Sequence, residues 1–347
     1  MVFSAGIPYA ETRYGDGYYF IKRQILWLTM GFLAMIVGSK IPTAVYRRLS
    51  PVFYALTLGL LVLVLLFGFV GNGAQRWISI GPLTIQPSEI AKLSLIMMLA
   101  KYFADNEERE YKESVRRGFV RGTLLPSLIM LVPIVLVMLQ RHLSCIIILG
   151  CIGLLLIFVS GVNPKYIAGF CALGAAAVSY LAFFTEYTKE RITVWQNPEA
   201  YKLTGGWQTL QGLMAIGTGG MFGVGLGASV LKHCYVSEPA NDMIFAILCE
   251  ELGIVGAAAA LGLFMLLVYR GCRLALRSKS TYSRLITLGI SIKMAIQVLL
   301  NVAVVTNSIP NTGISLPFFS YGGSSLIMLF FEMGILLSVS RSSVISK

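Results

Sequence analysis

About nine apolar runs, each close to the length of a membrane span, constrain the fold of this chain more than any other feature. A helix needs roughly 20 apolar residues to cross the hydrocarbon core of a bilayer. Of the 347 residues, 56% are hydrophobic and 13% are charged, whereas soluble domains carry about 25% charged residues. The sequence therefore predicts an all-α polytopic membrane protein that forms one transmembrane domain over residues 1–347. The expected spans are 24–39, 51–70, 89–103, 123–139, 143–161, 166–185, 243–269, 285–305 and 325–339.

The net charge of +12 comes from basic residues that gather in short loops between the apolar runs. In a soluble protein this charge would suggest nucleic acid as a partner. Here the positive-inside rule explains it, so we expect no nucleic-acid partner and place the loops around 101–121 and 270–284, with the C-terminus, in the cytoplasm. The six cysteines include no CxxC pair, which predicts buried thiols rather than disulfides or a zinc site.

The same alternation of spans places the N-terminus outside the cytoplasm. The chain begins MVFSA, which looks like the end of an apolar helix, and no signal peptide precedes it. We therefore expect a further first helix before residue 1, which would give an even number of spans with both ends in the cytoplasm.

A long segment at about 186–242 is expected on the outer side of the membrane, and loops of this length are usually structured and functional. Its glycine-rich middle is apolar, so we expect it to fold back as re-entrant backbone held within protein. The stretch GVGLGA at 223–228 matches a dinucleotide-binding pattern, but no strand precedes it, which argues against that function.

Charged residues cluster in an outer loop that leads into a span, at residues 71–93. Pro87 and Ser88 suit the start of that helix, and Glu89 and Lys92 are three residues apart, hence on one face. The sequence leaves two interpretations open. The two residues form a structural ion pair, or they line a polar cavity together with Arg76, since ionisable groups in a membrane usually face a cavity or pathway.

Two further sets of polar residues lie within the spans. Lys293, Gln297 and Asn301 recur every four residues and form a polar stripe, and Glu332 is a lone acid in the last span. Hydrogen bonding between helices is the simpler interpretation, and binding of a polar substrate is the other. A pair between Lys293 and Glu332 is conceivable, but the sequence does not place them together.

Asp242 is the sharpest candidate for chemistry, because it stands just before a long apolar run. Asn241 and Asp242 both suit a helix N-cap, where an acid is favoured by the helix dipole. A partly desolvated carboxylate at a membrane boundary also tends to have a raised pKa, which suits a general base. Glu250 and Glu251 lie about two turns further along, and we expect one of them to pair with a polar neighbour and neither to be easily reached from outside.

Three motifs together resemble one family, the SEDS proteins (shape, elongation, division and sporulation) typified by FtsW, RodA and SpoVE. They are GAQRWISIGPLTIQPSEIAKL at 73–93, EPANDMIFAILCEELGIVG at 238–256 and NTGISLPFFSYGGSSL at 311–326. LQRHLSC at 139–145 resembles the QPHLS element of the FtsW and SpoVE branch, with Arg141 in place of its proline. The resemblance implies a helix bundle of ten spans with cytoplasmic ends, so about nine are present here, and a multi-pass location in the bacterial cytoplasmic membrane.

The resemblance also implies an inverting peptidoglycan glycosyltransferase that polymerises lipid II at the outer membrane face and is partnered by a class B penicillin-binding protein. Asp242 falls on the family's essential aspartate and would be the base. Arg76, Lys92 or a divalent metal, Mg or Mn, would stabilise the leaving undecaprenyl diphosphate, and Glu89 would position substrate or support the fold. Alternatives are a lipid II flippase that uses Lys293, Gln297, Asn301 and Glu89 as a polar path, and an inactive scaffold for the partner. The element at 139–145 favours division or sporulation by resemblance alone, and the sequence does not settle the choice between division, elongation and sporulation.

Overall fold

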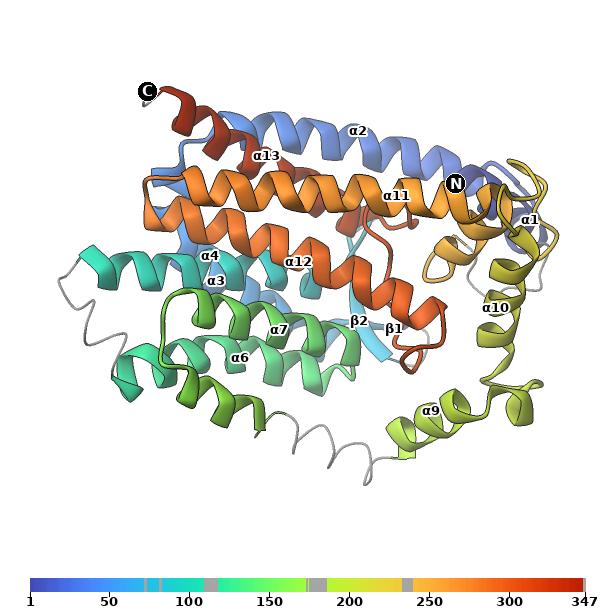
Figure 1. Cartoon of the computed structure of the whole chain (residues 1–347), viewed down its shortest axis with the longest axis horizontal. Coiled ribbons are helices and arrows are strands. Elements are labelled where there is room, and N and C mark those ends of the chain that lie inside the picture. The colour runs from blue at the N-terminus through green and yellow to red at the C-terminus, as the bar shows by residue number, and fades with distance from the viewer. Residues whose placement is uncertain are drawn as a thin grey trace. The chain divides into compact units, whose positions relative to one another are not determined.

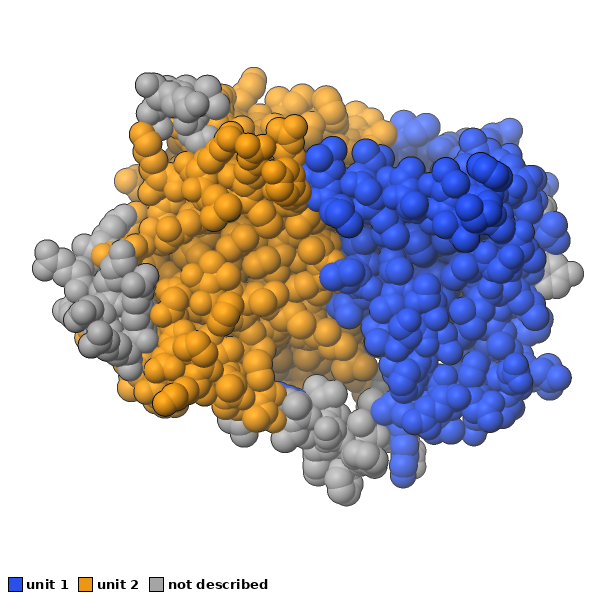
Figure 2. Space-filling view, viewed as in Figure 1, with its two compact units in different colours: residues 1–26, 173–266, 297–322 blue, residues 27–172, 267–296, 323–347 orange. Residues whose placement is uncertain are grey.

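The computed structural model describes residues 1–71, 74–80, 83–108, 118–172, 174, 186–232 and 240–345. The chain divides into two compact units, coloured separately in Figure 2. Unit 1 comprises residues 1–26, 173–266 and 297–322, and unit 2 comprises residues 27–172, 267–296 and 323–347. The chain therefore enters each unit more than once, so the units are not successive domains, and the expectation of a single transmembrane domain stays a prediction.

Helices dominate both units (Figure 1). Six described helices are long and apolar enough to cross a membrane, and α7 is a shorter apolar helix, which confirms the predicted all-α membrane fold. Of the expected span at 166–185, residues 166–172 are helical and most of the remainder lies outside the described residues. The helices that correspond to the other expected spans are α2 (Tyr19–Lys40), α3 (Thr43–Phe67), α4 (Pro87–Glu108), η1 (Val120–Leu124) with α6 (Leu125–Leu139), α7 (Leu143–Val159), α11 (Ile244–Arg277), α12 (Thr281–Val305) and α13 (Gly323–Ile345).

Helix α4 is the buried helix of unit 2. It packs against α3, α6, α7 and α13, and Ala91, Leu95 and Leu99 along it are fully buried. It is not among the six helices that meet the span criteria of length, hydropathy and charge. Because protein rather than lipid surrounds α4, charged side chains on it can find protein partners instead of hydrocarbon.

A small antiparallel sheet precedes α4, and the sequence analysis did not predict it. Its strands are β1 (Phe69–Gly71), β2 (Ala74–Ile80) and β3 (Leu83–Ile85), paired in the order β1-β2-β3. The register places Ile78 opposite Ile85 and Ser79 opposite Thr84. β-Branched and aromatic residues at these positions favour strands. The sheet fixes Arg76 on β2 and delivers the chain directly to the start of α4.

The long outer segment contains α9 (Glu186–Gln196), the short helix η2 (Pro198–Tyr201) and α10 (Trp207–Gly219), and α1 (Val2–Tyr14) belongs to the same unit. Helix α11 is broken at Gly253, which has φ 64° and ψ −170°. The glycine-rich backbone after α10 pairs with this break, since Val224 N donates to Glu250 O at 2.9 Å and Ile254 N donates to Gly220 O at 3.0 Å. The expectation that protein groups hold this backbone is confirmed.

Glycines make the close approach of this segment possible. A Cβ on Gly219 would lie 2.0 Å from the carbonyl oxygen of Cys249, and one on Gly223 would lie 2.2 Å from that of Glu251. Such contacts exclude any side chain at these two positions. Gly219 and Gly223 therefore serve close backbone packing.

Candidate active site

The backbone around Asp242 is clamped by two other parts of unit 1. Asp242 lies in a turn two residues before α11 begins, and its side chain is half-buried. Three successive carbonyl groups at 240–242 each accept a hydrogen bond. Tyr321 N donates to Ala240 O at 2.8 Å, and Ser320 Oγ donates to Asn241 O at 2.7 Å. Asn301 Nδ2 donates to Asp242 O at 3.0 Å. Because three successive carbonyl groups are fixed, the backbone position of Asp242 within unit 1 is constrained.

The loop at 311–322 also comes close to the Asp242 carboxylate. Gly313 has φ 71°, and a Cβ placed on it would lie 3.1 Å from Asp242 Oδ2. Gly313 N donates to Asn311 Oδ1 at 3.1 Å, which shapes the turn. Glycine is required here for two reasons, because the backbone is left-handed and because a side chain would crowd the carboxylate. The second and third sequence motifs thus meet at Asp242.

Two members of the predicted polar stripe on α12 hold this same loop. Asn301 is fully buried, and its Nδ2 donates to Ile314 O as well as to Asp242 O. Gln297 Nε2 donates to Ser315 O at 3.3 Å. These contacts show hydrogen bonding within the protein, the simpler of the two interpretations. A role for Gln297 and Asn301 in binding substrate stays a prediction.

Four of the other predicted charged residues lie in unit 2, where they form two buried ion pairs. Lys92 Nζ lies 2.7 Å from Glu89 Oε1, and Lys293 Nζ lies 2.6 Å from Glu332 Oε1. All four side chains are buried. The pair between Lys293 and Glu332, which the sequence could not establish, is therefore present, and it joins α12 to α13.

The two pairs also act on each other electrostatically. Lys293 interacts with the charge of Glu89, and Lys92 interacts with that of Glu332. The four groups together carry no net charge, which lowers the cost of burying them. Glu89 Oε2 is buried and accepts no hydrogen bond from any residue that the structure describes. Glu89 therefore keeps one acceptor oxygen for a further donor, so a cavity-lining role for it stays open beside the ion pair.

Arg76 contacts the turn between α6 and α7 through its side chain. Its Nη2 donates to the carbonyl oxygen of Arg141. Arg141 has φ 55°, and its N–H donates to Met138 O at 2.9 Å. Proline has φ near −65° and no N–H, so it could adopt neither feature. The arginine that replaces the family's proline therefore belongs to a turn of different backbone conformation.

This turn gives a prediction about stability. Arg141→Pro should lower the free energy of unfolding by about 2–3 kcal/mol, because it breaks a hydrogen bond and cannot reach the left-handed conformation. Arg141→Gly should leave stability unchanged or raise it by up to about 1 kcal/mol, because glycine removes the strain of positive φ. Thermal unfolding of both variants in detergent measures the difference. Equal melting temperatures for the two variants would contradict the assigned turn.

The same turn packs onto the start of α4. Ser88 Oγ lies 3.2 Å from His142 Nδ1, and Cys145 Sγ donates to Ser88 O at 3.6 Å. Gln86 N donates to Ser324 Oγ on α13 at 3.3 Å. The first motif is thus held at its helix start by α7 and by the end of the third motif.

Glu250 and Glu251 have partners in the glycine-rich loop, and both are buried. Glu250 accepts from Val230 N at 3.0 Å and from Ser229 Oγ, and Glu251 accepts from Lys232 Nζ at 3.1 Å. The expected pairing of one acid is confirmed, and the structure pairs the other acid as well. The sequence did not lead us to Ser229 and Lys232 as partners of these acids. The signal that could have identified them is a lysine three positions after a small polar residue in a largely apolar segment.

The described residues do not supply a metal centre of the usual kind, since they include no group of three or more His, Cys, Asp or Glu side chains arranged to hold an ion. The expected Mg or Mn therefore has no identified set of protein ligands in this part of the chain. No step of the reaction below uses a metal, and metal dependence stays a prediction.

Comparison with known proteins gives concordant results at the level of sequence. A family model of cell cycle proteins, covering FtsW, RodA and SpoVE, matches residues 1–345. Stage V sporulation protein E of Bacillus subtilis is 40% identical and aligns with 99% of this chain and 93% of its own length. A probable peptidoglycan glycosyltransferase FtsW of Geobacter metallireducens is 36% identical over 98% of this chain and 90% of its own.

Solved structures agree with the sequence relatives. A chain from a peptidoglycan synthase complex that coordinates polymerization and crosslinking has a TM-score of 0.79 at 28% identity, covering 99% of this chain and 95% of that one. The rod shape determining protein RodA of Thermus thermophilus has a TM-score of 0.69 at 28% identity, covering 98% of this chain and 93% of its own. The similarity extends over nearly the whole length in every case.

Proposed function

This chain belongs to the FtsW, RodA and SpoVE family of cell cycle proteins and is a multi-pass peptidoglycan glycosyltransferase, and we propose that Asp242 is the general base of its reaction. The observation that carries the proposal is the set of hydrogen bonds to the carbonyl groups of residues 240–242, which fixes the backbone of half-buried Asp242 beside the loop of the third motif. A carboxylate carried on a fixed backbone is suited to take a proton from a bound hydroxyl group.

The reaction joins a growing glycan strand to lipid II. The sugar hydroxyl of lipid II attacks the anomeric carbon of the strand, whose bond to the lipid diphosphate oxygen breaks as the new carbon–oxygen bond forms. Asp242 takes the hydroxyl proton, and undecaprenyl diphosphate leaves with the electron pair of the broken bond. A single displacement of this kind inverts the anomeric carbon, so an α-linked donor gives a β-linked glycan.

The leaving diphosphate needs compensating positive charge, and we assign this role to Arg76 and Lys92. Arg76 is half-buried on β2, and its guanidinium also contacts the Arg141 carbonyl oxygen. Lys92 is neutralised by Glu89 in the resting protein. The acceptor oxygen left on Glu89 can receive a donor from substrate, which would loosen the hold of Glu89 on Lys92. Glu89 then controls how much of the Lys92 charge is offered to diphosphate.

A class B penicillin-binding protein is its partner in the membrane, and one structural relative belongs to a peptidoglycan synthase complex that coordinates polymerization with crosslinking. The activity is tested with the purified protein, its partner and lipid II in detergent micelles. Glycan strands should appear on a gel without any sealed bilayer. A protein that moves lipid II across vesicles yet forms no glycan in micelles would instead be a flippase.

Asn301 gives a prediction about positioning. Asn301→Ala removes the donor that holds the Asp242 carbonyl group, and two buried carbonyl groups lose a hydrogen bond. We expect polymerisation to slow by about tenfold to a hundredfold, with the Michaelis constant for lipid II little changed, because misplacing a catalytic group lowers turnover more than binding. Initial rates over a range of lipid II concentrations separate these two effects.

The matched control is Thr306→Ala in the turn directly after α12, since the hydrogen bonds of the Thr306 hydroxyl go to Val302 and Ala303 at the end of that helix and to Ser308. This variant should keep the full rate. If Asn301→Ala raised the Michaelis constant and left turnover intact, Asn301 would bind substrate, as the sequence analysis also allowed, rather than position Asp242.

A further inference from the structure

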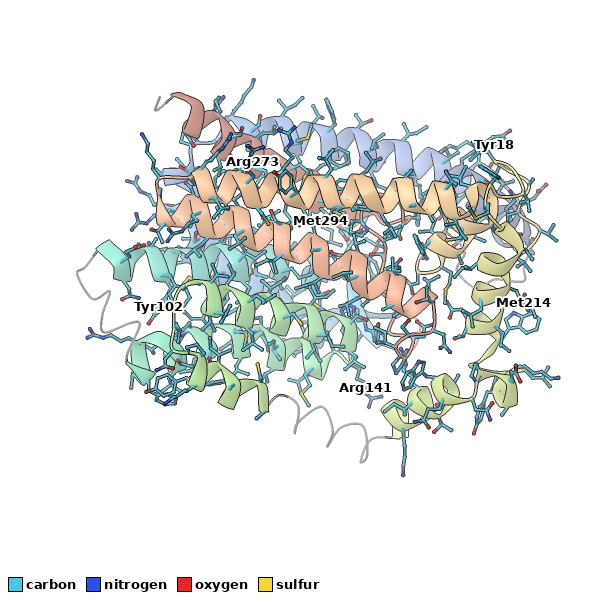
Figure 3. All side chains as sticks on the ribbon, in the orientation of Figure 1. Tyr18, Tyr102, Arg141, Met214, Arg273 and Met294 are labelled. Carbon is cyan, nitrogen blue, oxygen red and sulfur yellow. The ribbon has the colours of Figure 1, made fainter. Side chains whose placement is uncertain are left out.

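A pocket of about 380 Å³ lies in unit 2 between the C-terminal parts of α11 and α13. Its lining residues lie outside the three motifs, and no step of the reaction uses it. Arg270, Arg273 and Arg277 line it from α11, together with Leu274, and Leu336 and Leu337 line it from α13. Figure 3 labels Arg273 on the C-terminal part of α11. The pocket therefore combines a concentrated positive charge with an apolar wall.

The three arginines share one side of α11, because their spacing of three and four residues follows the helix period. All three are exposed. None forms an ion pair with any carboxylate among the described residues, whereas Arg47 pairs with Asp105 and Arg284 pairs with Glu107 in the same unit. The pocket thus carries three positive charges that the described part of the protein does not neutralise.

The apolar wall is open to the surroundings of the protein. Leu337 on α13 is 50% exposed, and Leu274 and Leu336 are partly exposed. The arginines come at the end of the apolar part of α11, in the basic stretch that the positive-inside rule assigns to the cytoplasmic side. They are therefore expected at the level of lipid phosphates, with leucines reaching toward the hydrocarbon.

We propose that this pocket binds an acidic glycerophospholipid of the cytoplasmic leaflet. The arginines hold the phosphodiester group through charge-assisted, forked hydrogen bonds, which guanidinium groups form better than ammonium groups do. The leucines of α11 and α13 accept an acyl chain. A free inorganic phosphate would use only the arginines, so the apolar wall favours a lipid, and basic pockets between helices at this membrane face are typical sites for anionic headgroups.

The test measures retained lipid by native mass spectrometry of the whole protein, purified in detergent with equal amounts of phosphatidylglycerol and phosphatidylcholine. The wild type should retain phosphatidylglycerol selectively. The triple variant Arg270→Gln, Arg273→Gln, Arg277→Gln should retain it at least about tenfold less, since each basic group near a membrane surface contributes appreciably to attraction of anionic lipid. Leu336→Trp, which fills the apolar wall and keeps all charges, should also reduce retention.

The matched control removes three charges from the same membrane side outside the pocket, through Arg48→Gln, Lys279→Gln and Arg341→Gln. It should retain lipid as the wild type does. Equal retention of both lipids by the wild type, or an equal loss in this control, would overturn the proposal. The triple arginine variant could also lose the copurified penicillin-binding partner while it retains lipid as the wild type does. That result would mean that the pocket contacts a protein, and it would overturn the lipid proposal as well. Inorganic phosphate added in excess should not displace the lipid, because it lacks the acyl chain.

Discussion

Asp242→Asn is expected to abolish polymerisation of lipid II while leaving the protein folded. Asparagine has nearly the same shape, so the hydrogen bonds to the carbonyl groups of residues 240–242 can persist. It cannot accept the hydroxyl proton, and general base catalysis typically contributes a factor of about 10² to 10⁴. The rate in micelles should therefore fall by at least about a hundredfold.

Controls must show that Asp242→Asn loses only its catalytic activity and keeps its fold and its partner. The variant should show the melting temperature of the wild type and should copurify with the penicillin-binding partner. Glu199→Gln removes an exposed carboxylate from the same outer segment and should keep the full rate. Normal glycan synthesis by Asp242→Asn would exclude this carboxylate as the base, whatever the other variants did.

Lys293→Met is expected to give the largest loss of stability. It leaves the fully buried Glu332 carboxylate without the ammonium group 2.6 Å away. Breaking a buried pair by removing one partner costs about 3–5 kcal/mol, because a buried charge is left uncompensated. The double variant Lys293→Met, Glu332→Leu should recover most of that loss, since it removes both charges and keeps the volume apolar. Thermal unfolding in detergent measures all three proteins, and Lys279→Met, at an exposed lysine, is the control.

The same double variant separates structure from catalysis. If it regains both its melting temperature and its polymerisation rate, the Lys293–Glu332 pair serves the fold alone. If the melting temperature returns and the rate does not, Lys293 acts on substrate, as one interpretation of the polar stripe holds. A melting temperature for Lys293→Met equal to that of the wild type would contradict the burial of this pair.

Short-range patterns identified most of the helices and gave the first motif's ion pair as one of two interpretations. Hydropathy over about 20 residues identifies a helix that must satisfy its own backbone in lipid. Glu89 and Lys92 are three residues apart, so any helix there brings them together. The strands at 69–85 were not predicted from the sequence. Strands β1 and β3 have only three residues each, and the strong helix signal of α4 follows β3 almost at once.

The hydrogen-bond partners around Asp242 could not be predicted from short-range sequence patterns. Asn301 reaches its carbonyl group from 59 positions away, and Ser320 reaches the neighbouring carbonyl from 79 positions away. The break at Gly253 was hidden inside an unbroken apolar run, because only the pairing of residues 250–255 with the glycine-rich loop replaces the helical hydrogen bonds there. No periodicity along the chain encodes such partners.

The amino-acid sequence by itself determined that this is a helical membrane protein, where its spans fall, and which carboxylate to suspect, because hydropathy and helical spacing act between near neighbours. Only the tertiary structure decided that Lys293 meets Glu332, that Asn301 and Ser320 hold the backbone of Asp242, and that three arginines of α11 share a pocket with α13. These contacts depend on how buried surfaces from distant segments fit together, and that fit is a property of the packed chain rather than of any one stretch.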